Sequence, residues 1–165
     1  SIDETRIHNN TLVANDKGLY VFNSLDNTIS DNLVMENGVG VQLTAGSVRE
    51  EVHGNSFINN DVPVLAVIGE QVTWNGTGAG NYWSSARQSD VDRDGINEVR
   101  YRPTGLVEHL VARNPQAAVF ANSPAFDAIR MAQSAFPVIE SPGVVDHHPL
   151  ARSPHDDWRR YYGRH

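Results

Sequence analysis

Apolar residues return at matching positions in three stretches of the first half of the chain. The stretches read IHNNTLVAN at 7–15, ISDNLVMEN at 29–37 and VHGNSFINN at 52–60, and their starts lie 22 and 23 residues apart. Each stretch combines short apolar runs with Asn or Gly. A repeat of roughly 20 to 50 residues is typical of a solenoid, in which every repeat forms one coil.

The aligned positions carry the same kinds of side chain in all three repeats. The columns are Ile7, Ile29 and Val52; Leu12, Val34 and Phe57; Leu19, Val41 and Val64; Val21, Leu43 and Ala66; Asn10, Asn32 and Asn55; and Asn15, Asn37 and Asn60. Stacked strands lie about 4.8 Å apart. We therefore expect the aliphatic columns to fill an interior. The Asn columns should stand at corners, adopt the left-handed conformation and bond along the stack.

These patterns predict a mainly β protein, in which residues 1–83 form about three to four coils of a right-handed parallel β-helix. Helical repeats are not expected, because the apolar residues lack a period of 3.6. The first residues already read like the middle of a repeat. We therefore expect the chain to be a fragment, with further coils before it.

The repeat is lost in the second half, where residues 84–165 are predicted to form a separate region. Tyr82 and Trp83 are large enough to cover the open end of the coils. Two amphipathic helices are expected, over 104–114 and 123–136, with Thr104 and Ser123 as their caps. The region should thus contain an acidic loop, an α-helical cap and an extended tail.

The acidic loop reads DVDRDGINE at 90–98. Calcium takes six to eight oxygen ligands, which alternating carboxylates on a tight loop supply. In the register of an EF-hand, the candidate calcium ligands are Asp90, Asp92, Asp94, the carbonyl of Ile96, and Glu98. Position 12 of that motif is Tyr101 instead of a bidentate Glu, so a complete EF-hand is not expected. A partial calcium clip and a charged loop without an ion both remain open.

The tail offers a second set of candidate residues. The adjacent imidazoles of His147 and His148 are a candidate copper site, because nitrogen ligands suit Cu²⁺. Trp158, Tyr161 and Tyr162 are candidate partner-binding residues, because a disordered end rarely retains three aromatic side chains.

Composition excludes several classes of function. The net charge of −7 argues against nucleic acid or an anionic membrane surface as the main partner. The chain has no cysteine, which excludes disulfides and thiolate metal sites. No apolar run approaches the roughly 20 residues of a membrane span.

Several motifs resemble the carboxy-terminal part of the NosD family. They are GNYWS at 80–84, the acidic loop at 90–98, YRPT at 101–104, NSPA at 122–125 and VVDHHPL at 144–150. The family usually has Asp where this chain has Glu98, and often Ser where it has His147. Both replacements retain oxygen or nitrogen ligands.

The resemblance implies a periplasmic parallel β-helix that works with an ABC transporter made of an ATPase and a permease. It also implies a copper chaperone as copper donor, and nitrous oxide reductase as the client whose copper-sulfur centre is assembled. Copper would then bind in the full-length protein, and no residue is assigned a catalytic role.

Two other classes of function remain open. One is a carbohydrate-active or carbohydrate-binding β-helix, which would need carboxylates or basic residues gathered on the outer face of the coils. The coils offer such residues only at scattered positions. The other is a surface repeat protein that calcium stabilises.

Overall fold

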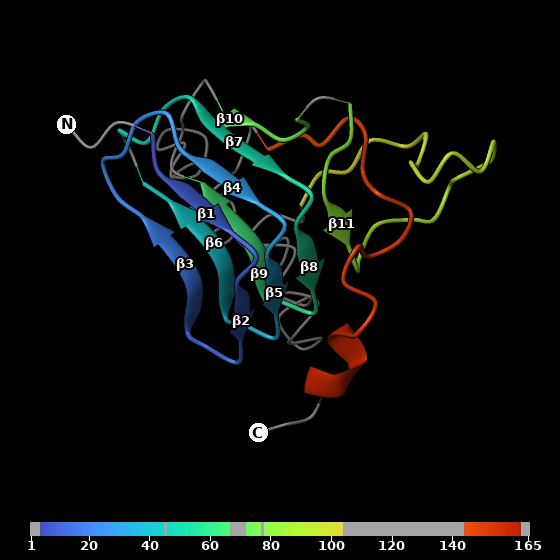
Figure 1. The fold of residues 1–165 in the computed structure, drawn as a ribbon, viewed down its shortest axis with the longest axis horizontal. Coiled ribbons are helices and arrows are strands. Elements are labelled where there is room, and N and C mark those ends of the chain that lie inside the picture. The colour runs from blue at the N-terminus through green and yellow to red at the C-terminus, as the bar shows by residue number, and fades with distance from the viewer. Residues whose placement is uncertain (1–3, 45, 67–71, 77, 104–143, 163–165) are drawn as a thin grey trace, which may run out of the picture.

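Three parallel sheets enclose the interior of the coiled part of the chain (Figure 1). The structure is a computed structural model that describes residues 4–44, 46–66, 72–76, 78–103 and 144–162. The first sheet contains β1 (Arg6–His8), β4 (Thr28–Ser30), β7 (Glu50–His53) and β10 (Val72–Thr73); the second contains β2 (Thr11–Val13), β5 (Leu33–Met35), β8 (Ser56–Ile58) and β11 (Tyr82–Trp83); the third contains β3 (Lys17–Val21), β6 (Val39–Leu43) and β9 (Val62–Ala66).

Each coil contributes one strand to each sheet. Among the described residues this makes three coils, and β10 and β11 add part of a fourth. The strands pair in parallel throughout these sheets. The predicted mainly β, parallel β-helix architecture is therefore confirmed.

The register of the sheets matches the aliphatic columns expected from the repeats. The paired columns are Ile7, Ile29 and Val52 in the first sheet, Leu12, Val34 and Phe57 in the second, and both Leu19, Val41 and Val64 and Val21, Leu43 and Ala66 in the third. The members from the second and third coils are buried and form one cluster. A slip of one residue would turn these side chains to the outside, so their burial sets the register.

The asparagine columns form ladders of hydrogen bonds at the corners. Asn10 donates through Nδ2 to Asn32 Oδ1 at 3.0 Å, and Asn32 donates to Asn55 Oδ1 at 2.9 Å. Asn55 in turn donates to Asn81 Oδ1 at 2.9 Å. Asn15, Asn37 and Asn60 form a second ladder in the same way. The expected bonding along the stack is thus present.

The prediction that the ladder asparagines adopt the left-handed conformation is wrong. The residue before each one has the positive φ: Asn9 at 56°, Asp31 at 55° and Gly54 at 67° in the first ladder. The preceding residue therefore makes the turn in the left-handed region. The side-chain amide of the ladder asparagine can therefore point along the stack. Its Oδ1 also accepts the backbone N–H of the ladder asparagine in the preceding coil, as Asn32 Oδ1 does from Asn10 and Asn55 Oδ1 from Asn32.

Aromatic rings close the end of the interior beyond the third coil. The rings of Phe57 and Trp83 stack with centroids 4.3 Å apart, and Tyr101 lies on Trp83 at 4.6 Å. Trp83 therefore lies over the end of the core as predicted. Tyr82 does not, because successive side chains of a strand point to opposite faces; it packs in a second cluster with Leu33 and other residues.

The two predicted helices, at 104–114 and 123–136, lie outside the described residues. The residues on either side of this segment meet, because Tyr101 and Asp146 form an antiparallel bridge with N to O distances of 2.8 and 3.0 Å. Tyr101 and Val144 belong to the core cluster of the coils. The described residues on both sides of the segment thus share the interior of the β-helix.

In the described part of the chain, no helix is both long and apolar enough to cross a membrane. The 3-10 helix η2 (Trp158–Tyr161) lies in the tail, which passes beside β11 and β8 (Figure 1).

We expect Asn55→Ala to lower the free energy of unfolding by roughly 3 kcal/mol, because it leaves buried hydrogen-bonding groups of two neighbouring coils without partners. Urea denaturation of the variant and the wild type measures this change, provided that the two proteins have similar m values. The control is Asn10→Ala at the exposed end of the ladder, which should cost less. Equal losses in both variants would contradict a special role for the buried part of the ladder.

Replacing residues 104–143 by two glycines should leave the coils folded. The Tyr101–Asp146 bridge and the stack of Phe57, Trp83 and Tyr101 are formed by residues that the replacement retains. The new connection is short enough for a hairpin. We expect the free energy of unfolding to fall by no more than about 1 kcal/mol. Loss of the β-sheet signal in circular dichroism at 25 °C would contradict this expectation.

Candidate functional site

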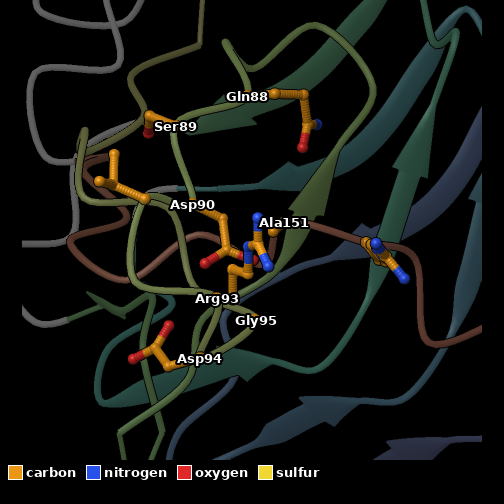
Figure 2. Close-up of a pocket in the computed structure, with 9 residues that line it drawn as sticks. Gln88, Ser89, Asp90, Arg93, Asp94, Gly95 and Ala151 are labelled. Atoms are coloured by element: carbon orange, nitrogen blue, oxygen red, sulfur yellow. The ribbon is translucent and has the colours of Figure 1, made fainter.

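The acidic loop brings three carboxylates together. Ligand oxygens of Asp90, Asp92 and Glu98 lie within 4.8 Å of one another. Asp94 is outside this group, and its Oδ1 accepts the backbone N–H of Ile96 at 2.8 Å. Figure 2 shows the Asp94 carboxylate directed away from that of Asp90. Of the predicted calcium ligands, the structure thus gathers three carboxylates and leaves Asp94 apart.

Hydrogen bonds within the loop stabilise its turn. Arg93 and Gly95 have φ values of 64° and 91°, which produce the sharp turn. Glu98 Oε1 accepts the backbone N–H of Val91 at 2.8 Å and that of Asp92 at 3.3 Å. The bond from Val91 holds the pKa of Glu98 below its usual value. The carboxylate is therefore ionised at neutral pH.

One oxygen of the cluster lacks a donor. Asp90 Oδ1 is buried and has no hydrogen-bond partner. A buried acceptor without a donor is costly, and a bound cation would remove that cost. The cavity on this side of the loop has a volume of about 680 Å³, and Arg152 is one of the residues that line it. Arg93 lines it as well (Figure 2).

The other side of the loop is attached to the tail. The buried Asn97 donates its backbone N–H to Pro149 O at 2.8 Å, and Ala151 donates to Gly95 O at 2.9 Å. Ile96 and Leu150 form an antiparallel bridge. These contacts place the segment that carries the two adjacent histidines directly beside the loop.

The two sets of residues predicted to bind metals therefore share a cavity. It has a volume of about 340 Å³ and is lined by Asp92, Asp94, Ile96, Asn97, Glu98, His147 and His148. Both histidines are exposed. Nothing in the sequence indicated this proximity, because it depends on backbone contacts between residues 95–97 and 149–151.

Asp146, which sequence reasoning did not single out, lies between this cavity and the core. Its carboxylate is fully buried and ends the first asparagine ladder: Oδ2 accepts the N–H of Asn81 at 2.7 Å and Trp83 Nε1–H at 2.8 Å. Oδ1 accepts the N–H of His148 at 3.1 Å. Burial raises the pKa of Asp146 above its usual value, although these donors oppose the shift. A Cβ on Gly80 would lie 1.9 Å from Asp146 Oδ1, so only glycine fits there.

The tail then crosses the outer face of the second sheet. Ser56 Oγ lies 2.7 Å from His155 Nδ1 and 2.8 Å from Ser153 Oγ. The Nε2 of His155 lies 3.0 Å from the carbonyl oxygen of Asp31, one coil further back. The tail, which was predicted to be extended, is thus bonded to the coils through Ser153 and His155.

The aromatic residues of the tail have an intramolecular role. Trp158 and Tyr161 pack on a second apolar cluster, formed by Leu33, Met35 and Ile58 on the outer face of β5 and β8. Tyr162 remains 60% exposed. Trp158 and Tyr161 thus have a structural role, because they bury the outer cluster. Partner binding by Trp158, Tyr161 and Tyr162 stays a prediction.

The donors for copper among the described residues are nitrogens and oxygens. The chain has no cysteine, and Met35 is fully buried beneath the tail. Cu⁺ favours sulfur ligands, whereas imidazole and carboxylate suit Cu²⁺. The exposed pair His147 and His148 therefore fits Cu²⁺ better than Cu⁺.

Comparison with known proteins places the coils in a family. A family model described as "Periplasmic copper-binding protein (NosD)" matches residues 1–87. Two similar proteins are each named "Probable ABC transporter binding protein NosD". The one from Pseudomonas aeruginosa is 42% identical over 141 residues, which are 86% of this chain and 33% of that protein. The one from Stutzerimonas stutzeri is 41% identical over 138 residues, 84% of this chain and 32% of that protein. The chain thus spans about a third of the length of the curated relatives it matches.

We expect Trp158→Ala to lower the free energy of unfolding by roughly 2 kcal/mol, because it exposes part of the outer apolar cluster. Tyr162→Ala, which removes an exposed ring four residues later, serves as the matched control and should change stability by less than about 0.5 kcal/mol. Thermal and urea denaturation measure both. If the two variants were equally stable, the packing of the tail on β5 and β8 would not contribute to folding.

Proposed function

The chain belongs to the NosD family, and we propose that it acts as a non-catalytic periplasmic assembly factor that docks on an ABC transporter. The observation that carries this proposal is the 42% identity, over 86% of the chain, to a protein named as a probable ABC transporter binding protein. A match of 141 residues in this chain of 165 extends beyond the coils and includes the acidic loop. The description of the family supports the periplasmic location and the binding of copper.

In the finer form of this proposal, the partners are the permease and ATPase of the transporter, a copper chaperone as donor, and nitrous oxide reductase as client. Copper is cargo here and serves the assembly of the copper-sulfur centre of the client. Among the described residues, we place copper at the histidine pair beside the acidic loop, because both histidines are exposed and the Met35 sulfur is buried. The coils would act as a scaffold whose rigidity comes from the ladders and the core.

The test is retention of the purified chain by the detergent-solubilised permease–ATPase complex. We expect the wild-type chain to be retained, and Tyr162→Ala to be retained less, because Tyr162 is the exposed aromatic residue of the tail. Tyr20→Ala removes another exposed ring, on β3 at 53% exposure, and should bind like the wild type. No retention of a chain that is folded by circular dichroism would contradict docking through this part of the protein.

A second candidate, binding of a carbohydrate, is favoured by one feature of the first sheet. Its outer face carries a cavity of about 390 Å³, lined by Arg6, His8, Thr28, Ser30, Glu51 and His53. Such side chains could form hydrogen bonds with hydroxyl groups. Chemical-shift changes at His8 and His53 on titration with acidic and neutral oligosaccharides would support it, and none at millimolar concentrations would count against it.

We further propose that calcium clips the acidic loop to the tail. The three clustered carboxylates and the buried Asp90 oxygen support this role. Excess EDTA should lower the melting temperature, and Ca²⁺ should restore it, while partner specificity stays intact. Asp92→Asn should abolish the effect and Asp94→Asn should retain it, because Asp94 is outside the cluster. An unchanged melting curve with EDTA would exclude a structural ion.

A further inference from the structure

A carboxyl group is buried at the corner where the first strand of the third coil begins. Glu50 is the first residue of β7 and is fully buried. Its Oε1 accepts a hydrogen bond from Asn27 Nδ2 at 2.9 Å, whereas its Oε2 is buried without a hydrogen-bond partner. A buried charge is costly unless it is paired and hydrogen-bonded, so this corner is poorly suited to an ionised carboxylate.

The other buried carboxylate, Asp146, shows how such a group is satisfied in this fold. Its two oxygens accept hydrogen bonds from Asn81, Trp83 and the backbone of His148. The hydrogen bonding that favours the charged form of Glu50 comes from Asn27 alone. Glu50 is therefore the less satisfied of these two buried carboxyl groups.

The charged groups around Glu50 do not compensate for its burial. Asp26, just before β4, carries a negative charge that opposes ionisation of Glu50. The guanidinium of Arg49 binds the carboxylate of Asp26, with Nη2 at 2.6 Å from Oδ2. On the other side, β10 offers Val72 and Thr73, which carry no charge. Burial is thus the main reason why the pKa of Glu50 lies above its usual value.

The remaining titratable side chains of β7 face away from this corner. Glu51 and His53 line the cavity on the outer face of the first sheet. Alternate side chains of a strand point to opposite faces, so these two lie on the other side of the sheet from Glu50. The proton equilibrium of Glu50 is therefore set by the corner itself.

The stack is least firmly held on the β10 side of Glu50. β7 lies between β4 and β10, and Val72 of β10 pairs with Glu50. Among the described residues, β10 has only two residues and ends its sheet. On the β4 side, the buried Asn27 is hydrogen-bonded to both Ser24 and Glu50. Opening β10 is thus the least costly way to bring water to the unpaired oxygen, because a short edge strand has few contacts to lose.

We propose that Glu50 is a pH-dependent switch, whose neutral form closes the corner between β7 and β10 and whose ionised form loosens β10. A group that holds its proton more tightly in the folded than in the unfolded state contributes stability that is fully present below its unfolded pKa. This contribution is lost as the pH rises through its folded pKa. The corner should therefore be better closed at mildly acidic pH than at alkaline pH. The proposal depends neither on docking to a transporter nor on an ion in the acidic loop.

Hydrogen exchange of the full chain, followed by NMR, tests the switch locally. Protection factors correct for the intrinsic pH dependence of exchange, and those of the β10 amides should fall severalfold between about pH 5 and pH 8. Glu50→Gln keeps an acceptor for Asn27 but cannot ionise, so its β10 amides should stay protected at both pH values. Glu51→Gln, which changes the next residue on the outer face, is the matched control and should behave like the wild type.

Two further readouts guard against an effect of Glu50→Gln on packing. The carboxyl carbon of Glu50 in the wild type should titrate above the usual range for glutamate, in parallel with the loss of β10 protection. The amide of Asn32, which donates to Asn55 Oδ1 in the buried ladder, reports on the coils and should change less than β10. The proposal is overturned if Glu50 titrates in its usual range, if β10 protection does not change with pH, or if Glu50→Gln retains the pH dependence of the wild type.

Discussion

The hydrogen-bonded ladder that ends at Asp146 is the constraint on which the rest of the structure depends. The side-chain amide of each asparagine donates to the asparagine of the next coil, as Asn55 does to Asn81. The ladder ends where Asn81 Nδ2 lies 3.5 Å from Asp146 Oδ2. Asn32, Asn55 and Asn81 are fully buried, so each of them must be satisfied within the stack. A carboxylate suits the final position, because it only accepts hydrogen bonds and has several donors around it.

This ending links the core of the coils to the surface that carries His147 and His148. Asp146 contacts Trp83 Nε1 in the aromatic stack on one side and the backbone of His148 on the other. The neighbouring residues 149–151 then hold the acidic loop. A change in the ladder would therefore be transmitted to the loop through the peptide units next to Asp146. The end of the ladder therefore helps to position both the histidine segment and the acidic loop.

The tail uses the outer face of the second sheet in a different way. Apolar side chains at Leu33, Met35 and Ile58 point outward and would be exposed on a bare solenoid. Trp158 and Tyr161 cover them. The contact between His155 and Ser56 on β8 attaches the tail to this sheet. This face is therefore occupied by the chain itself. The surfaces left for partners among the described residues include the polar face of the first sheet and the rim around Tyr162.

The sequence by itself determined the coils, because their period, the inward-facing columns and the ladder asparagines are all local and repeat at equivalent positions. It also identified the acidic loop and the histidine pair, since alternating carboxylates and adjacent imidazoles are visible in short segments.

It did not show that Asn81 continues the ladder, because the residues between Trp74 and Asn81 interrupt the repeat. Nor did it show that the loop and the histidines share a cavity, that Asp94 lies apart from the other carboxylates, or that the tail covers an apolar face. Those features depend on contacts between residues far apart in the chain, such as Asn97 with Pro149 and Ser56 with His155. Only the packing of the tertiary structure decides which of such segments meet.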